Sequence, residues 1–225
     1  MYFHRNNVAI LGAGGHAKVI IDIIKDKLIN LPCDLDKQYV NLYLYDDKKD
    51  MLGISINNVS IKGNIRDKKY GTPYLICAIG DNNIRRSIVN DIENSLNSSM
   101  TWWVNIIGKN CSIAKTGFID IGTVIFNNVN IGPNVVIGRH SIINNHSNID
   151  HDCTIGEFVH IAPGAILCGG VEIGNGTLIG AGATILPNIK IGKNLIIRAG
   201  SMIKEDILSQ DDRIKYYKKY YPIDY

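Results

Sequence analysis

The stretch IDIGTVIFNNVNIGPNVVIGRHSIINNHSNIDHDCTI, residues 119–155, repeats one pattern every six residues. An aliphatic side chain returns at every sixth position over the longer range 107–203. These aliphatic positions are Ile107, Ile113, Ile119, Ile125, Ile131, Ile137, Ile143, Ile149, Ile155, Ile161, Leu167, Ile173, Ile179, Ile185, Ile191, Ile197 and Ile203. Four residues after each of them, from Ile113 on, lies a small, β-branched or aliphatic residue that is never charged. Such a repeat indicates an architecture of stacked units.

A period of six residues excludes the two common regular structures. The faces of an α-helix recur every 3.6 residues and those of a strand every two residues. A chain that turns a corner every six residues forms a triangular prism, with one strand on each side and the aliphatic residues inside. Three hexapeptides make one coil, so residues 107–203 predict roughly five coils, hydrogen-bonded to one another and spaced about 4.8 Å apart. A β-sandwich would not keep a six-residue period without interruption over residues 107–203.

The first 100 residues lack the repeat and alternate between strand and helix patterns. Strand patterns cover 8–11, 41–45 and 74–79. An amphipathic helix runs to about Lys27, and a second one contains Arg85 and Arg86. This alternation predicts a small Rossmann-like α/β domain with a parallel sheet. We therefore expect an α/β domain at 1–100, a parallel β-helix at 101–206 and a polar tail at 207–225.

The first strand pattern leads into a glycine-rich segment. Gly12-x-Gly14-x-x-Ala17 fits the G-x-G-x-x-A form of the dinucleotide fingerprint, whose glycines let backbone N–H groups approach a phosphate at a helix N-terminus. The expected acidic residue comes later than the usual ~20 residues downstream, and no second mononucleotide-binding half follows. The segment therefore favours a diphosphate other than NAD. A glycine turn that only permits close packing is the alternative.

The composition excludes several classes of function. The formal net charge of +3 is too small to argue for a nucleic-acid partner, and no apolar run approaches membrane-spanning length. The five cysteines are scattered, without a CxxC pair, so the sequence predicts neither a disulfide framework nor a zinc knuckle. We expect a cytoplasmic protein without nucleic-acid or membrane partners.

Four histidines lie within the repeat: His140, His146, His151 and His160. None occupies an inward position, so all four are expected to point outward and to stay out of the core. Gly169 follows His151 by one 18-residue coil and should lie directly above it, within about 5 Å. A base beside a glycine N–H is what acyl transfer needs, because the base accepts a proton and the N–H stabilises an oxyanion.

His160 is half a coil away from both His151 and Gly169, on another side of the prism. It could act at the same site only if a neighbouring prism presented it, which favours a trimer with interfacial sites. Cys153 falls on an inward position and is expected to be a core residue rather than a nucleophile.

The segment Asn145-His-Ser-Asn-Ile-Asp-His-Asp-Cys-Thr-Ile-Gly-Glu-Phe-Val-His-Ile-Ala-Pro-Gly-Ala165 resembles the central motif of nucleotide-sugar acetyltransferases. That family includes 4-amino-4,6-dideoxysugar N-acetyltransferases and sialic-acid O-acetyltransferases. Gly12-Ala-Gly-Gly-His16 and Ala78-Ile-Gly-Asp-Asn-Asn-Ile-Arg85 are similar to its first domain. The hexapeptide repeat resembles the left-handed β-helix superfamily. The resemblance covers nearly the whole chain and implies an α/β N-terminal domain followed by an all-β left-handed parallel β-helix.

The resemblance also implies roles for individual residues. His151 matches the general base, and Asp152 matches the acid that raises its basicity. The positions that contact acetyl-CoA, the co-substrate, are His160, Gly169, Ala181 and Ala199. The positions that hold the nucleotide-linked amino sugar are Gly14, Gly15, His16, Asp46, Asp47 and Gly80. The implied reaction is direct acetyl transfer to the 4-amino group of a nucleotide-linked 4-amino-4,6-dideoxyhexose, without an acyl-enzyme.

The sequence is also compatible with three other functions. The same histidine could serve a hydroxyl group, as in sialic-acid O-acetyltransferases. The spacing of His146 and His151 resembles two zinc ligands of the γ-type carbonic anhydrases, but residues 110–115 offer no third histidine, so no metal site is predicted. A non-catalytic scaffold that binds sugar nucleotides is the third alternative.

Overall fold

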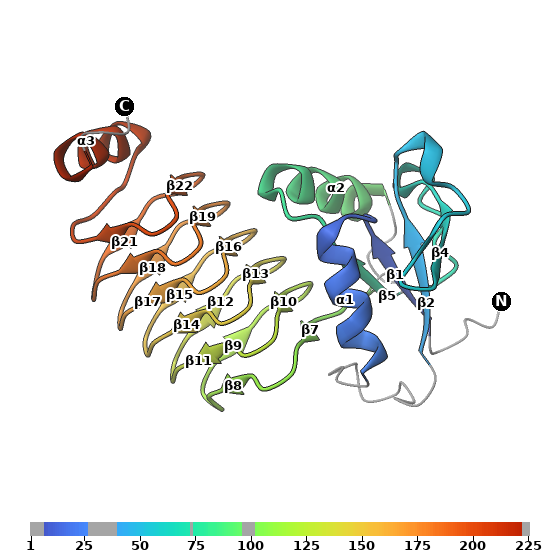
Figure 1. Ribbon diagram of the computed structural model, residues 1–225, viewed down its shortest axis with the longest axis horizontal. Helices are drawn as coiled ribbons and strands as arrows, with labels where there is room; N and C mark the ends of the chain where they lie inside the picture. The colour runs from blue at the N-terminus through green and yellow to red at the C-terminus, as the bar shows by residue number, and fades with distance from the viewer. Residues whose placement is uncertain (1–6, 27–39, 73, 96–101, 222–225) are drawn as a thin grey trace. The chain divides into compact units, whose positions relative to one another are not determined.

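The computed structural model describes residues 7–26, 40–72, 74–95 and 102–221, which form two compact units (Figure 1). The first unit contains the described residues up to Lys109 together with Ile121–Val124. The second contains Asn110–Asp120 and the described residues from Ile125 onward. The domain boundary expected at 100–101 and the last four residues of the expected tail lie outside the described residues.

A mostly parallel sheet forms the centre of the first unit, with strand order β3-β4-β2-β1-β5-β6. The strands are β1 (Asn7–Leu11), β2 (Asn41–Tyr45), β3 (Ser55–Ile56), β4 (Val59–Gly63), β5 (Tyr74–Cys77) and β6 (Trp102–Trp103). Only the β3–β4 pair is antiparallel. The parallel α/β arrangement predicted from the sequence is confirmed. The β3–β4 hairpin was not expected; Asn57 and Asn58 form its turn with φ of 47° and 59°, which suits asparagine.

Helices follow the neighbouring strands β1 and β5 of this sheet. They are α1 (Gly15–Lys25) and α2 (Asn82–Ser95), with short 3-10 turns η1 (Lys49–Met51) and η2 (Ile65–Asp67). Helix α1 buries one apolar face, which includes Ile20, Ile21 and Ile24. Because β1, β2 and β5 are parallel, the loops that follow them meet at one edge of the sheet. That edge is where a ligand site is expected in an open α/β sheet.

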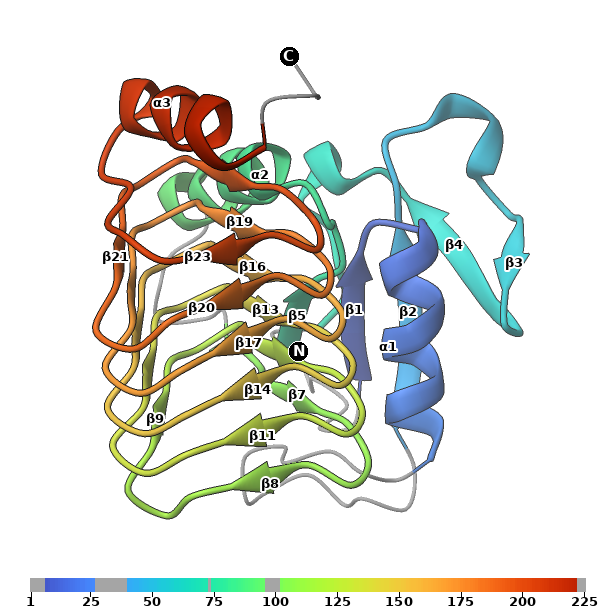
Figure 2. The same ribbon diagram turned by 60° about the vertical axis from the view of Figure 1, so that its left-hand side comes forward.

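The hexapeptide region forms the three-sided, left-handed parallel β-helix that the sequence predicts (Figure 2). Side 1 has the order β22-β19-β16-β13-β10-β7, with bounds Ile196–Ile197, Leu178–Ile179, His160–Ile161, Ile142–Ile143, Val124–Ile125 and Ile106–Ile107. Side 2 has the order β23-β20-β17-β14-β11-β8, with bounds Met202–Ile203, Thr184–Ile185, Ile166–Leu167, Asn148–Ile149, Asn130–Ile131 and Ser112–Ile113. Side 3 has the order β21-β18-β15-β12-β9, with bounds Lys190–Ile191, Glu172–Ile173, Thr154–Ile155, Val136–Ile137 and Phe118–Ile119.

Each strand pairs in parallel with the strand 18 residues further along the chain, as Ile131 does with Ile149 and Ile149 with Leu167. The second residue of each strand from β7 to β23 is one of the repeated aliphatic residues. Most of these side chains are buried inside the prism. Cys153 is also buried, and its thiol donates to the carbonyl oxygen of Cys168 at 3.2 Å.

The corners of the prism have a backbone signature of their own. Every sixth residue from Asn110 to Gly200 has a positive φ, with Thr116 as the exception. Asparagine, aspartate and glycine tolerate this left-handed conformation, whereas a β-branched residue such as threonine does not. The corner residues of successive coils therefore form columns in which positions i and i+18 are neighbours.

His140 corrects one expectation from the sequence. Its side chain is 0% exposed, so it does not point into solvent like the other three histidines of the repeat. The imidazole stacks on the ring of Phe158, one coil above, with ring centroids 5.2 Å apart and planes inclined by 12°. Arg139 lies over the same phenyl ring at 5.6 Å. A corner residue can therefore be buried when an aromatic ring from the next coil covers it.

The segment expected to be a polar tail contains helix α3 (Gln210–Tyr220). Ser209 caps α3 by accepting a hydrogen bond from the backbone N–H of Asp212. Tyr216 and Tyr217 are buried rather than solvated. The hydroxyl of Tyr217 accepts from the backbone N–H of Arg198 at 2.7 Å, and that of Tyr216 donates to the carbonyl oxygen of Met202 at 2.6 Å. Phenol groups thus satisfy backbone groups at the open edge of the last coil.

None of the helices within the described ranges is long and apolar enough to cross a membrane.

We expect Tyr217→Phe to lower the free energy of unfolding by about 1 kcal/mol, because the partly buried N–H of Arg198 loses its acceptor. Urea denaturation measures this change. The matched control is Tyr220→Phe, whose hydroxyl only reaches Glu205 on the surface at 3.5 Å; this variant should change stability by less than about 0.5 kcal/mol. Equal effects of the two substitutions would contradict the capping role.

Candidate active site

His151 and Asp152 occupy the corner between β14 and β15. Nδ1 of His151 and Oδ2 of Asp152 are 2.7 Å apart, and the backbone N–H of His151 donates to Oδ1 of Asp150 at 2.8 Å. A neutral imidazole that donates from Nδ1 to a carboxylate carries its lone pair on Nε2. The arrangement therefore presents Nε2 of His151 as a base.

The charges around His151 strengthen this base. The hydrogen bond to Asp152, followed by the charge of Asp150, raises the pKa of the imidazole above its ordinary value. In turn, a hydrogen bond from Asn134 and then the one from His151 lower the pKa of the Asp152 carboxyl group. The side chains of His151 and Asp152 are 59% and 56% exposed, so both can be reached from solvent.

Gly169 lies one coil above His151. The backbone N–H of Gly170 donates to the carbonyl oxygen of His151 at 2.9 Å, which joins the two coils at this corner. A Cβ atom on residue 169 would lie only 2.6 Å from Cε1 and 2.7 Å from Nε2 of His151. Glycine is therefore required for the imidazole to lie against the backbone of the next coil. The 18-residue spacing brings this pair together as expected.

The other residues expected to contact acetyl-CoA lie elsewhere on the β-helix. His160 projects from β16 on side 1, and its Nε2 is 3.2 Å from Nδ2 of Asn144. Ala181 and Ala199 are exposed at the corner that follows side 1, where the backbone N–H of Gly200 donates to the carbonyl oxygen of Ala181 at 2.8 Å. One chain does not bring these three residues to His151. Asn144 was not predicted, because its contact with His160 spans 16 residues and departs from the 18-residue columns.

A separate pocket of about 320 Å³ lies at the edge of the first unit where β1, β2 and β5 end. It contains all six residues expected to hold the nucleotide sugar: Gly14, Gly15, His16, Asp46, Asp47 and Gly80. Helix α1 begins there without a side-chain cap and without an acidic residue in its first turn. A Cβ atom on Gly14 or Gly15 would meet no atom within 4 Å, so this backbone is open to the pocket. An uncapped helix N-terminus of this kind attracts anions such as phosphate.

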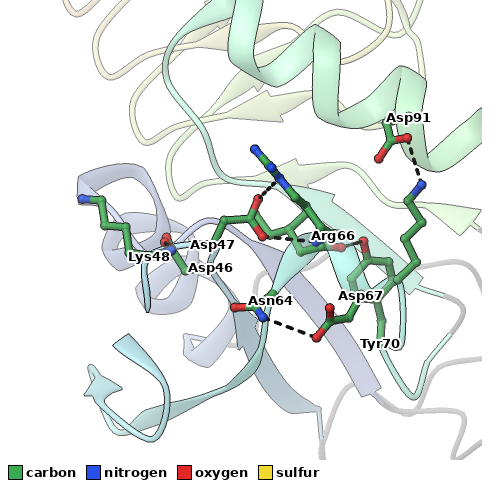
Figure 3. Close-up of polar contacts among 10 residues, drawn as sticks. Asp46, Asp47, Lys48, Asn64, Arg66, Asp67, Tyr70 and Asp91 are labelled. Atoms are coloured by element: carbon green, nitrogen blue, oxygen red, sulfur yellow. Dashed lines mark hydrogen bonds and ion pairs between the residues drawn. The ribbon is translucent and has the colours of Figure 1, made fainter. Parts of the chain in front are cut away.

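The two aspartates of the pocket organise its walls (Figure 3). Oδ2 of Asp46 accepts from the backbone N–H of Ala13 at 2.8 Å, which ties the glycine-rich loop to the end of β2. Asp47 accepts from the backbone N–H of Arg66 at 3.1 Å and forms an ion pair with its guanidinium group at 3.2 Å. Lys48 also lines the pocket. Arg66 and Lys48 were not predicted, and the position of Arg66 depends on the unexpected strand β4.

His16 and Gly80 face each other in the same pocket. A Cβ atom on Gly80 would lie 2.6 Å from Cε1 of His16, so the ring lies against this glycine. Arg85, which is 0% exposed, donates to the carbonyl oxygens of Ile79 at 2.9 Å and Gly80 at 3.1 Å. Burial and then the charge of Arg85 lower the pKa of His16, so this imidazole is neutral near pH 7.

Within the described part of the chain, no three histidine, cysteine, aspartate or glutamate side chains gather where they could hold a metal ion. His146, which resembled a zinc ligand by its spacing, lies 3.5 Å from Asn128 through Nε2.

Two parts of the chain match known protein families. Residues 7–92 match the family described as PglD N-terminal domain, and residues 152–186 and 170–205 match the bacterial transferase hexapeptide repeats. A protein described as uncharacterized, from Acanthamoeba polyphaga mimivirus, is 33% identical over 119 residues, which cover 52% of this chain and 21% of that protein. The match thus spans about a fifth of the length of this curated relative.

Two solved structures are similar over most of the chain. PerB from Caulobacter crescentus, in complex with CoA and GDP-perosamine, is 27% identical with a TM-score of 0.76 and 91% of each chain covered. The acetyltransferase domain of PglB from Neisseria gonorrhoeae, in complex with acetyl coenzyme A, is also 27% identical with a TM-score of 0.79. That comparison covers 91% of this chain and 93% of the PglB domain.

Residues 110–203 form a parallel β-helix of hexapeptides, and part of this region matches the hexapeptide repeats of bacterial transferases. The first unit matches the PglD N-terminal domain. Together with the similar structures, these matches support a hexapeptide-repeat sugar acetyltransferase.

We expect Asp152→Asn to lower the pKa of His151, because the hydrogen bond to this carboxylate is the main cause of its elevation. NMR titration of the Cε1–H resonance of His151 measures the pKa directly. Asp150→Asn is the matched control, since Asp150 acts through its charge and should have the smaller effect. A larger shift in the Asp150 variant would show that the Nδ1 contact does not control the base.

Proposed function

We propose that this protein transfers the acetyl group of acetyl-CoA to the 4-amino group of a nucleotide-linked 4-amino-4,6-dideoxyhexose. The observation that carries the proposal is the position of the His151 imidazole, hydrogen-bonded at Nδ1 to Asp152 and lying against Gly169 at Nε2. The complexes of the similar structures with acetyl coenzyme A, and with CoA and GDP-perosamine, support the choice of substrates.

The diphosphate and the amine of the nucleotide sugar require different surroundings, and we assign different residues to each. The diphosphate suits the pocket at the N-terminus of α1, where backbone N–H groups and Lys48 attract negative charge. His16, neutral because of its buried position, can hydrogen-bond there without adding a charge. The amine of the sugar needs a base, which is the role we assign to His151.

The chemistry needs one proton acceptor and one oxyanion donor. Nε2 of His151 takes a proton from the amine as its nitrogen attacks the carbonyl carbon of the thioester. The backbone N–H of Gly169 stabilises the negative charge on the carbonyl oxygen. When the carbon–sulfur bond breaks, the proton held by His151 passes to the sulfur, and CoA leaves as a thiol. The amide product and regenerated His151 balance the reaction without an acyl-enzyme.

We further propose a homotrimer with active sites between subunits. His160, Ala181 and Ala199 lie on a different side and corner of the prism from His151, so a single chain cannot present both sets to one acetyl-CoA molecule. A neighbouring copy can supply the second set. The proposal keeps the cytoplasm as the location, where thiols such as those of Cys77 and Cys168 stay reduced.

O-acetylation of a sugar hydroxyl is the second candidate, because His151 could deprotonate a hydroxyl group in the same way. The similar structure of a perosamine N-acetyltransferase from Caulobacter crescentus, in complex with CoA and GDP-perosamine, favours the amine.

We expect thiol release from acetyl-CoA in the presence of UDP-, dTDP- or GDP-linked 4-amino-4,6-dideoxyhexoses, such as viosamine or perosamine. His151→Asn should lower kcat by about 10²–10⁴-fold, the usual contribution of a general base. A matched control is His146→Asn, which changes an exposed corner histidine away from Gly169 and should leave kcat unchanged. Turnover only with hydroxyl acceptors would favour O-acetylation, and no turnover with any acceptor would refute the proposed function.

A further inference from the structure

Asn134 lies one coil below Asp152 in the same corner column. Its Nδ2 donates a hydrogen bond to Oδ1 of Asp152 at 3.0 Å, while Oδ2 of the same carboxylate contacts Nδ1 of His151 at 2.7 Å. The carboxylate is therefore held at both oxygens, by an amide below and by the imidazole beside it. Asn134 was not singled out in the sequence and takes no part in the proton transfer itself.

The backbone holds Asn134 in place for this contact. Its N–H donates to Oγ1 of Thr116, one coil further down, at 3.0 Å. The N–H of Asp152 donates to the carbonyl oxygen of Pro133 at 2.9 Å. Asn134 and Asp152 have φ angles of 59° and 60°, so both residues have the same left-handed backbone conformation at this corner. The column from Thr116 to Asp152 is thus linked at each step.

This support matters because the catalytic pair is exposed. A carboxylate in solvent rotates among several orientations, and an exposed ion pair gains little once the entropy of holding both side chains is counted. The amide of Asn134 limits the rotation of Asp152. With Oδ1 held, Oδ2 remains directed at Nδ1, and Nε2 of His151 stays beside Gly169.

Among the described residues, the charged groups that raise the pKa of His151 are Asp152 and Asp150, both in its own coil. The coil below contributes Pro133 and Asn134, and the coil above contributes Gly169 and Gly170, none of which carries a charge. An effect of Asn134 on the base therefore passes through Asp152.

We propose that Asn134 is a positioning residue for the general base: it fixes the Asp152 carboxylate so that His151 keeps its proton on Nδ1 and its lone pair on Nε2. This inference rests on the proposed acetyl transfer. A neutral donor also draws charge away from a carboxylate, which would weaken its pull on the imidazole. Because His151 and Asp152 are exposed, we expect the fixed orientation of the carboxylate to matter more than this loss of charge. Removal of the Asn134 amide should therefore leave His151 a weaker base.

The test uses the full-length protein with Asn134→Gly, since glycine accepts the left-handed corner conformation without strain. Asn128→Gly is the matched control. Asn128 has a φ of 60° in the same coil and also contacts the residue 18 positions ahead, His146, but it lies at another corner. Two quantities are measured: the pKa of His151 by NMR titration in the unliganded protein, and the pH profile of kcat/KM for acetyl transfer.

In Asn134→Gly we expect the NMR pKa of His151 and the acidic limb of the pH profile to shift to lower pH. We also expect kcat to fall by about three- to ten-fold with unchanged KM values, a small part of what a general base contributes. Asn128→Gly should match the wild type in all of these. A His151 pKa that stays constant or rises in Asn134→Gly overturns the positioning role. Absence of thiol release in the wild type instead overturns the acetyl transfer, and the NMR result distinguishes the two failures.

Discussion

The coil-to-coil hydrogen bond of the β-helix is the constraint on which the transferase half of this protein depends. Each strand pairs with the strand 18 residues later, without a shift of register from β8 to β23. Positions 18 residues apart therefore become neighbours on every side and at every corner. The contact of His151 with Gly169 and that of Asn134 with Asp152 are both instances of this spacing. The chemistry that we propose uses a geometry that the fold supplies at each coil.

The open edges of such a stack need protection, because the last coil has backbone groups with no further coil to pair with. Here Tyr217 of helix α3 accepts from the backbone N–H of Arg198, and Tyr221, directly after the helix, accepts from that of Met202. Helix α3 thus covers the end of the β-helix.

Much of the β-helix could be predicted from the sequence because the period of six is a local, repeated property. From this period followed the β-helix itself, the burial of Cys153 and the contact of His151 with Gly169. The burial of His140 could not be predicted in this way, since it depends on the ring of Phe158 in the next coil. Arg66 was missed because its place beside Asp47 follows from strand β4, whose short, mixed pattern gave no clear signal. The resemblance to a family, rather than periodicity, gathered the six residues of the nucleotide-sugar pocket.

A crystal structure with CoA and the amino-sugar nucleotide would show whether the acceptor reaches His151. We expect the sulfur of CoA at the corner formed by His151 and Gly169, with the acceptor nitrogen about 2.6–3.2 Å from Nε2 of His151. The diphosphate should lie in the pocket at the N-terminus of α1. A complex in which the acceptor nitrogen lies at another corner, out of reach of His151, would contradict the account.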